Sequence, residues 1–288
     1  MSHGLLSNYR RPATRATPAR VRPGTMKIHA LTTGTARLKR AFMYPRRGPR
    51  RQLDLFLPGD WYDPVPIHCW AIEHEDKLML VDTGETTSVH DVPFCRFEVA
   101  PGEELPHALA AAGLSVADVE TVVLTHMHCD HMDGAVHVGV PILVHDRELA
   151  YSRTRGARFF QRVLRQPVPS GADFKPLALD GGVFGAFARS RPLSDDGRIV
   201  AVDTPGHTPG HMSVVCVDDE ERHVLLAGDT TDTLEQLHAR RPDAVSPKPV
   251  VTVQTMDRIL AHGRAHPTVY LPSHDTESAE RLAAGTTL

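Results

Sequence analysis

Residues that can bind metal ions are concentrated in one short stretch of this 288-residue chain. Between Leu124 and Gly134 the sequence is LTHMHCDHMDG, which places three histidines and two aspartates within the eight residues 126–133. Three imidazoles that became charged together in a structural loop would repel one another, whereas a metal ion makes their proximity favourable. The stretch therefore predicts a metal site.

The spacing within this stretch indicates how its ligands divide. His126 and His128 stand at i and i+2 of an extended segment, so they face the same side and can hold one ion together. Asp130 and His131 come after a turn, and we expect them to point to a different spot. Imidazole and carboxylate suit Zn, Fe, Co, Ni or Mn. The four cysteines are scattered without a CxxC pair, which excludes a closed thiolate site.

Further candidate ligands follow apolar runs that predict strands. Such runs cover residues 120–126, 198–207, 223–230 and 268–275. They end near His126, His207, Asp229 and His274, and the carboxyl ends of strands are where the sites of α/β proteins form. We expect these side chains to converge.

Together these residues make seven candidate ligands, more than one tetrahedral ion can use. The surplus predicts two metals. In such centres the ions lie about 3.5–4 Å apart, bridged by a carboxylate and by a water whose pKa falls toward about 7. The resulting bridging hydroxide is the nucleophile that we expect.

Other patterns predict the elements that position these ligands. Residues 67–74 and 77–84 predict a hairpin, and 141–145 and 212–219 predict further strands. Residues 103–114, 146–153 and 252–262 have helical spacing. This order predicts an α/β, layered α+β architecture with sheets inside and helices outside, in one domain over residues 26–288. The segment 147–197 is compatible with a lid, a dimer contact or an insertion that narrows the substrate cleft.

Composition and charge limit the class of protein. Hydrophobic residues make up 41% and charged residues 23%, and no apolar run approaches the ~20 residues of a membrane span. Residues 1–53 hold thirteen Lys and Arg and no acidic residue, and residues 1–25 predict a flexible basic extension. This extension lacks aromatic residues interleaved with its basic ones, and the rest of the chain is acidic, so we expect no nucleic-acid partner. We expect a soluble cytoplasmic protein with no membrane partner and a small-molecule substrate; a homodimer is compatible with the sequence.

These motifs, taken in order, resemble the metallo-β-lactamase superfamily. The motifs on which the resemblance rests are HxHxDH (126–131), TPGH ending at His207, AGD ending at Asp229, PSHD around His274, and VDTG with Asp82. The resemblance covers roughly residues 27–288 and implies an αβ/βα four-layer sandwich, with the metals in a cleft between two sheets. It implies the following ligands: His126, His128 and His207 for the first metal, Asp130, His131 and His274 for the second, and Asp229 as the bridge.

The same resemblance implies supporting roles for two further residues. Asp82 is expected to hydrogen-bond a ligand imidazole and fix its tautomer. Of the two histidines in TPGHTPGH, the ligand corresponds to His207, so His211 is expected to pack behind it or support it. Zinc is the expected metal, with Fe, Co or Mn as alternatives.

Within the superfamily the chain is most similar to the quorum-quenching N-acyl homoserine lactone lactonases. In that family an aromatic loop before the metal motif cradles the acyl chain, and Phe94 and Phe97 are the matching residues. The resemblance implies attack of the bridging hydroxide on the lactone carbonyl. Asp130 and Asp229 are then the catalytic residues, with Asp130 carrying a proton to the ring oxygen.

One position departs from that family. The best-known lactonases have a tyrosine three residues after the bridging aspartate, where this chain has Asp232. Asp232 is therefore our third candidate for substrate contact. A phenol would then come from Tyr44, Tyr62 or Tyr151, or the substrate is a different ester, a lactam or an organophosphate.

Other functions of the scaffold remain as alternatives. A glutathione thioesterase would need a basic pocket near the C-terminus, but we expect Arg258, Arg264 and Arg281 on helix surfaces. An iron redox protein would carry a flavin domain, and only some twenty residues follow Thr268. A β-lactamase with this first site generally lacks the bridging aspartate that Asp229 supplies.

Overall fold

The computed structural model describes residues 25–46 and 48–288; the extension expected over residues 1–25 lies outside them, apart from Thr25. The first sheet contains β1 (Lys27–Leu38), β2 (Val65–His74), β3 (Lys77–Val81), β4 (Cys95–Glu98), β5 (Val119–Leu124), β6 (Ile142–His145) and β7 (Phe174–Leu177). The second contains β8 (Ser190–Pro192), β9 (Ile199–Asp203), β10 (Met212–Val217), β11 (His223–Gly228) and β12 (Thr268–Pro272).

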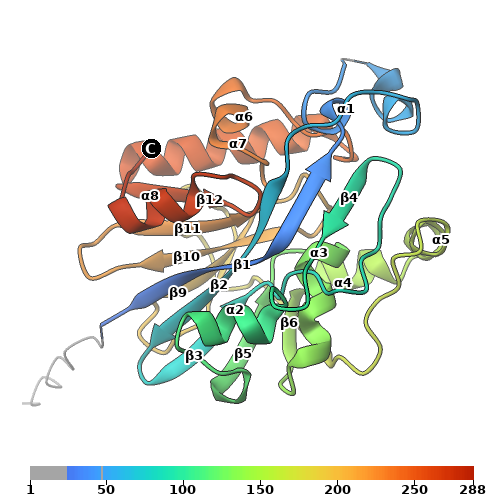
Figure 1. Ribbon diagram of the computed structural model, residues 1–288. Coiled ribbons are helices and arrows are strands. Elements are labelled where there is room, and N and C mark those ends of the chain that lie inside the picture. The colour runs from blue at the N-terminus through green and yellow to red at the C-terminus, as the bar shows by residue number, and fades with distance from the viewer. Residues whose placement is uncertain (1–24, 47) are drawn as a thin grey trace, which may run out of the picture.

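Helices cover the outer faces of these sheets (Figure 1). The α-helices are α1 (Arg40–Met43), α2 (Leu105–Ala111), α3 (Cys129–Met132), α4 (Asp146–Ser152), α5 (Arg155–Val163), α6 (Leu234–Ala239), α7 (Pro249–Ala265) and α8 (Ser278–Ala284). Short 3-10 helices are η1 (Pro49–Arg51), η2 (Leu53–Leu55), η3 (Val116–Asp118) and η4 (Asp133–His137). The strand orders are β4-β1-β2-β3-β5-β6-β7 and β12-β11-β10-β9-β8.

Alternation along the strands explains why the sheets pack face to face. In β11, Leu226 points into the core between the sheets, whereas Leu225 packs under α6 and α7. In β5, Val123 faces the core between the sheets, whereas Val122 packs beneath α2 and α4. Because successive side chains of a strand point to opposite faces, both faces of each sheet are buried. The result is four layers, helices, sheet, sheet and helices, and the expected fold class is confirmed.

Strand direction brings the carboxyl ends of the relevant strands to the same edge. β3 and β5 are parallel neighbours, as are β11 and β12. β9 and β11 are each antiparallel to β10, so these two also run in one direction. The segments that leave β5, β9, β11 and β12 therefore start from one edge of their sheets, and all carry expected ligands.

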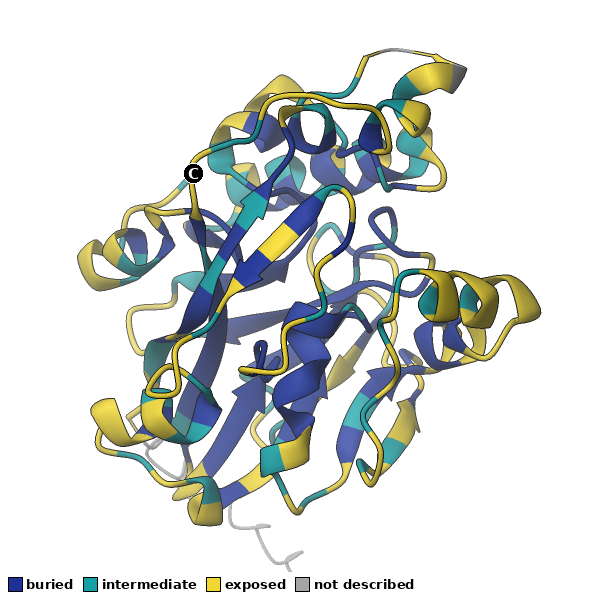
Figure 2. Ribbon diagram, turned by 45° about the vertical axis from the view of Figure 1, so that its right-hand side comes forward, coloured by how far each residue is buried: buried dark blue, intermediate teal, exposed yellow. Residues whose placement is uncertain are grey.

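The segment 147–197 supplies an edge strand to each sheet. β7 pairs in parallel with β6, and β8 pairs antiparallel with β9. α5 precedes β7 and lies on the surface, where it is largely exposed (Figure 2). Phe159 and Phe160 on this helix are exposed. In the described part of the chain, no helix is both long and apolar enough to cross a membrane.

Candidate dinuclear metal centre

The seven expected ligands come together in two groups. The first group is His126, His128, His207 and Asp229, and the second is Asp130, His131 and His274. Within each group the ligand atoms lie within 4.8 Å of one another. All of these side chains are buried except His128, which is half-buried. The loop after β5 therefore contributes to the first group and α3 to the second, as the spacing of this segment indicated.

Asp229 lies between the two groups, with one carboxylate oxygen toward each. Its Oδ1 is 3.2 Å from Nε2 of His131 and 3.5 Å from Nε2 of His274. Its Oδ2 is 3.5 Å from Nε2 of His207 and 3.9 Å from Nε2 of His126. This is the arrangement of a carboxylate that bridges two metal ions.

Several ligand atoms have no hydrogen-bond partner in the described part of the chain. They are Nε2 of His126, Nε2 of His131 and Oδ1 of Asp229. The last two lie 3.2 Å apart as an ion pair, and Nε2 of His126 lies 3.9 Å from Oδ2 of Asp229. A buried polar atom without a hydrogen bond costs about 1–3 kcal/mol, and a metal ion among these atoms would remove that cost. Imidazole nitrogens and carboxylate oxygens are ligands for Zn, Fe, Co and Mn. The residues present thus fit two divalent ions.

Asp82 orients one of these rings, and its own position is fixed by the backbone. Its Oδ2 accepts hydrogen bonds from Nδ1 of His131 at 2.9 Å and from the Thr125 hydroxyl at 2.9 Å. Its Oδ1 accepts from the Thr125 N–H at 2.7 Å. Because Nδ1 of His131 is engaged, Nε2 is left to face the centre. Asp82 thus occupies the supporting position predicted for it.

Asp243, which the motifs did not indicate, does the same for His207. Its Oδ2 accepts from Nδ1 of His207 at 2.9 Å, and its other partner is Ser246, whose N–H and hydroxyl donate at 2.7 and 3.0 Å. On the opposite side, Nδ1 of His274 donates to the Pro66 carbonyl at 2.9 Å. The rings of His207 and His274 are therefore held with Nε2 toward Asp229.

Glu148 on α4 joins two of the loops that carry candidate ligands, and it belongs to none of the sequence motifs. It is 2% exposed, and its two oxygens accept from the N–H of Met127 at 3.2 Å and of Gly210 at 3.1 Å. A side chain at Gly210 would place its Cβ 2.1 Å from the Glu148 nitrogen, so glycine permits this approach. The loops after β5 and β9 are thereby fixed relative to each other.

His211 lies directly behind the bridging aspartate. It is fully buried, its Nε2 accepts from the Asp229 N–H at 3.1 Å, and its Nδ1 lies 3.0 Å from the Thr204 hydroxyl. Burial lowers the pKa of His211 to about 3, so the ring stays neutral and can accept this hydrogen bond. The ring therefore supports Asp229 and is not one of the grouped ligands.

The ligand histidines differ in their affinity for protons. Burial lowers the pKa of His126 well below its usual value and that of His128 to about 4. Burial acts in the same direction on His131 and His274, but Asp229 and neighbouring carboxylates outweigh it and raise both pKa values well above the usual range. Divalent ions would displace these protons, so we expect metal uptake to release protons.

Comparison with known proteins places this centre in a family. The model of the metallo-beta-lactamase superfamily matches residues 62–282, which include every ligand described above. The chain belongs to the metallo-beta-lactamase superfamily. It is a metal-dependent hydrolase of that superfamily.

Individual relatives agree with this assignment. An N-acyl homoserine lactonase from Bacillus sp is 26% identical over 198 residues, which cover 65% of this chain and 72% of the relative. A solved N-acyl homoserine lactone hydrolase with N-hexanoyl-L-homoserine bound at its catalytic metal centre is 19% identical and has a TM-score of 0.70, covering 89% and 96% of the two chains. A dizinc quorum-quenching lactonase is 18% identical, with a TM-score of 0.62 over 88% and 89%.

The two phenylalanines expected to contact an acyl chain both pack against other apolar side chains, and their contact with a substrate stays a prediction. Phe97 is 7% exposed and packs in the core around β1, β2 and β4. Phe94 is half-buried between Phe42, at a ring-centroid distance of 6.0 Å, and Phe56, at 5.9 Å. Alternation along β4 turns Phe97 inward, which a single motif does not reveal.

Asp232 is enclosed at the start of α6. It is 2% exposed, its N–H donates to Oε1 of Gln236 at 2.7 Å, and its Oδ2 accepts from Nε2 of Gln236 at 3.1 Å. Burial, followed by the negative charges of Asp243 and Asp229, raises the pKa of Asp232 to about 7. Its carboxyl group is therefore held by the protein, and a role in substrate contact stays a prediction.

A tyrosine hydroxyl does reach the turn that carries the bridging aspartate, but it comes from β12. The fully buried Tyr270 places its hydroxyl 2.6 Å from that of Thr230 and 2.8 Å from that of Thr231. By contrast, Tyr44 and Tyr62 pair with each other at a centroid distance of 6.1 Å. Tyr270 thus stabilises the turn after Asp229, a role that no sequence motif indicated.

Proposed function

We propose that this hydrolase opens the lactone ring of N-acyl homoserine lactones at a centre of two divalent ions. The observation that carries the proposal is the position of Asp229, with one oxygen toward each group of ligands. When bound, the two ions would polarise the lactone carbonyl and supply hydroxide at neutral pH. The lactonases among the relatives support the choice of substrate.

Asp130 is the residue that we propose for proton transfer. It is 8% exposed, and its Oδ2 lies 3.2 Å from Nε2 of His274. Burial raises the pKa of Asp130, but His131 and His274 outweigh it, so the pKa lies below its usual value and the group is ionised at neutral pH. An ionised carboxylate beside the centre can accept a proton and return it to the alkoxide of the opened ring.

Zinc is the metal that we propose, since the donor set accepts it and one structural neighbour is a dizinc enzyme. Quorum quenching would be the biological consequence of ring opening. The single domain over residues 26–288, the cytoplasmic location and the homodimer stay predictions from the sequence.

The glutathione thioesterase alternative is weakened because Arg281, one of the three arginines near the C-terminus, is buried in an ion pair. Arg281 does not lie on a helix surface: it is 7% exposed and pairs with Asp275 at 2.7 Å. It also donates to the Tyr270 carbonyl at 3.2 Å. The guanidinium is therefore committed inside the protein and is not available to a glutathione carboxylate.

The test compares metal content and ring opening in one set of samples. Metal is measured by elemental analysis, and proton release from a short and a long acyl homoserine lactone is followed in a pH-stat. We expect ring opening in wild type and none in Asp229→Ala, which should also bind about two fewer ions per chain than wild type because the dinuclear centre is lost. The exposed Asp118 offers a matched control, because Asp118→Ala should behave as wild type. Two bound ions without lactone hydrolysis would refute the substrate and turn the search to phosphotriesters, thioesters and lactams.

A further inference from the structure

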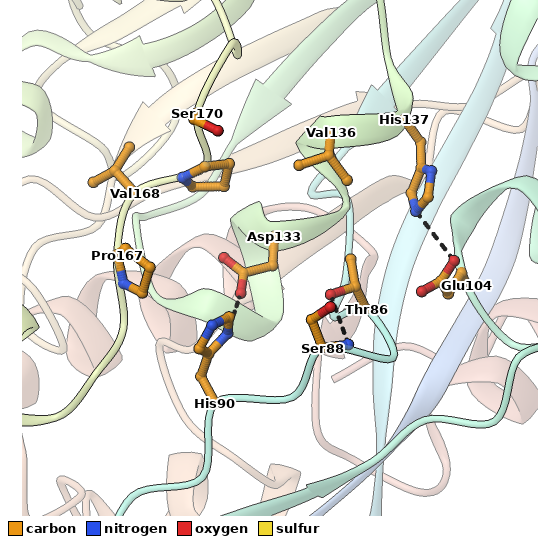
Figure 3. A pocket seen from close by; sticks show the side chains of 11 residues that line it. Thr86, Ser88, His90, Glu104, Asp133, Val136, His137, Pro167, Val168 and Ser170 are labelled. Atoms are coloured by element: carbon orange, nitrogen blue, oxygen red, sulfur yellow. Dashed lines mark hydrogen bonds and ion pairs between the residues drawn. The ribbon is translucent and has the colours of Figure 1, made fainter.

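A second cluster of metal-binding side chains lies outside the dinuclear centre. Glu85, His90 and Asp133 offer ligand atoms that lie within 4.8 Å of one another. Glu85 follows the turn after β3, His90 lies in the loop before β4, and Asp133 begins η4. Figure 3 shows His90 and Asp133 facing each other, with Nδ1 of the histidine 2.8 Å from Oδ2 of the aspartate.

Both carboxyl groups of this cluster are buried with one oxygen unpaired. Glu85 is fully buried; its Oε1 accepts from the Thr86 N–H at 2.9 Å, whereas Oε2 has no hydrogen bond in the described part of the chain. Asp133 is 4% exposed, and Oδ1 likewise has no partner there. Buried carboxylates without compensation are costly, so two unpaired oxygens at one place indicate a missing cation.

Protein cations do not fill this need among the described residues. Asp133 forms its ion pair with His90, and Glu85 forms none with Lys or Arg. One imidazole cannot neutralise two carboxylates, even when it is protonated. With both carboxyls ionised, the cluster would hold excess negative charge at a buried position. Burial, followed by the charge of Asp133, raises the pKa of Glu85 to about 8, so the charge is balanced either by a proton on Glu85 or by a divalent ion that displaces it.

The backbone fixes this cluster by close contact between two turns. The Gly134 N–H donates to the Gly84 carbonyl at 3.0 Å, and a Cβ at Gly134 would lie 2.1 Å from the Thr83 oxygen. Gly84 adopts φ +74°, a left-handed conformation that favours glycine. These contacts hold Glu85 and Asp133 side by side, so the donor atoms are positioned before any ion arrives.

We propose that Glu85, His90 and Asp133 bind a third divalent cation, separate from the dinuclear centre. One imidazole and two carboxylates suit Zn, Mn, Fe or Co. A cavity of about 380 Å³, lined in part by His90 and Asp133, adjoins the cluster and gives an ion a path and room for water ligands (Figure 3). The ion would tie the His90 loop to the segment that carries His131.

The test is the difference in bound zinc between wild type and variants of the cluster. Each protein is dialysed to equilibrium against Zn²⁺ and its metal counted by elemental analysis. Wild type should bind one more ion per chain than either His90→Asn or Glu85→Gln. His137→Asn is the matched control, because His137 lines the same cavity but pairs with Glu104 at 3.3 Å, and it should bind as wild type does.

Two results would overturn the proposal: wild type and both variants bind equal amounts of zinc, or His137→Asn loses as much zinc as His90→Asn. Equal binding means that the two carboxyls share a proton in place of an ion. Circular dichroism establishes that each variant folds, and His90→Asn suffices if Glu85→Gln does not, since His90 is half-buried. The test does not depend on the dinuclear centre. Adding His90→Asn to Asp229→Ala should still lower the bound zinc by one ion per chain.

Discussion

Removing the Asp243 carboxylate should weaken metal binding without touching a ligand. Asp243 accepts the Nδ1 proton of His207 at 2.9 Å, and at 4% exposure no bulk water can replace it. In Asp243→Ala the ring is free to rotate and Nε2 loses its fixed direction toward the first group of ligands. The ring also becomes a poorer donor, because the carboxylate no longer polarises it.

Two independent estimates of the size of this effect agree. Loss of a hydrogen bond to a charged group costs about 1.5–3 kcal/mol. Loss of a partner that orients a metal ligand typically weakens metal affinity by about 10–100-fold, which corresponds to about 1.4–2.8 kcal/mol. We therefore expect the dissociation constant for zinc in the first group to rise by about 10–100-fold in Asp243→Ala.

Competition with a chromophoric chelator measures this dissociation constant. Ser246→Ala is the comparison variant: it removes the hydroxyl that donates to Oδ2, the oxygen that also accepts from His207, but leaves the Asp243 carboxylate and the Ser246 N–H on Oδ1 in place. Its zinc affinity should stay within about twofold of wild type. An unchanged affinity in Asp243→Ala would refute the reasoning, and an equal loss in both variants would assign the effect to the loop.

Three further changes test other parts of the structure. Gly134→Ala places a Cβ 2.1 Å from the Thr83 oxygen and should lower the free energy of unfolding, measured by urea denaturation, by about 1–3 kcal/mol. Gly139→Ala meets open space and should lower it by less than about 0.5 kcal/mol. Equal losses in the two variants would contradict the close contact at Gly134. Burial, followed by the charge of His223, lowers the pKa of His262 to about 4 in the folded protein. As the pH drops from 6.5 to 4 the unfolded chain binds a proton at this residue before the folded protein does, so the free energy of unfolding falls. Thermal denaturation at several pH values should show a smaller fall for His262→Gln and the wild-type fall for His107→Gln, on the surface of α2; a wild-type fall in His262→Gln would contradict this assignment. Asp82→Ala frees the His131 ring and should weaken zinc in the second group by about 10–100-fold in chelator competition, and full retention would show that the ring needs no such support.

The sequence alone indicated the candidate ligands, which the fold brings together in two groups, and most of the elements that carry them. Metal binding demands particular side chains, and a strand followed by a turn sets local directions, so the spacing of His126, His128 and Asp130 already indicated a division between two positions. Eight strands lie within the predicted runs or overlap them: β2, β3, β5, β6, β9, β10, β11 and β12. Their strong apolar periodicity explains this agreement.

Strands with weak periodicity were not predicted. β1, with the sequence KIHALTTGTARL, mixes polar and apolar residues and has a register shift between Thr32 and Thr35. It is a strand because β2 and β4 pair with it on both sides. Such pairing satisfies the backbone of a segment whose own pattern does not specify it.

Only the tertiary structure decided which ordinary residues support the centre. Asp243 lies 36 positions from His207, Glu148 lies 62 from Gly210, and neither belongs to a motif. It likewise turned Phe97 into the core and buried Arg281 beside Asp275. The physical reason is that a hydrogen bond or an ion pair depends on distance in space. The sequence shows which residue types can bind a metal. The residues that orient them through hydrogen bonds are decided only when the two sheets pack together.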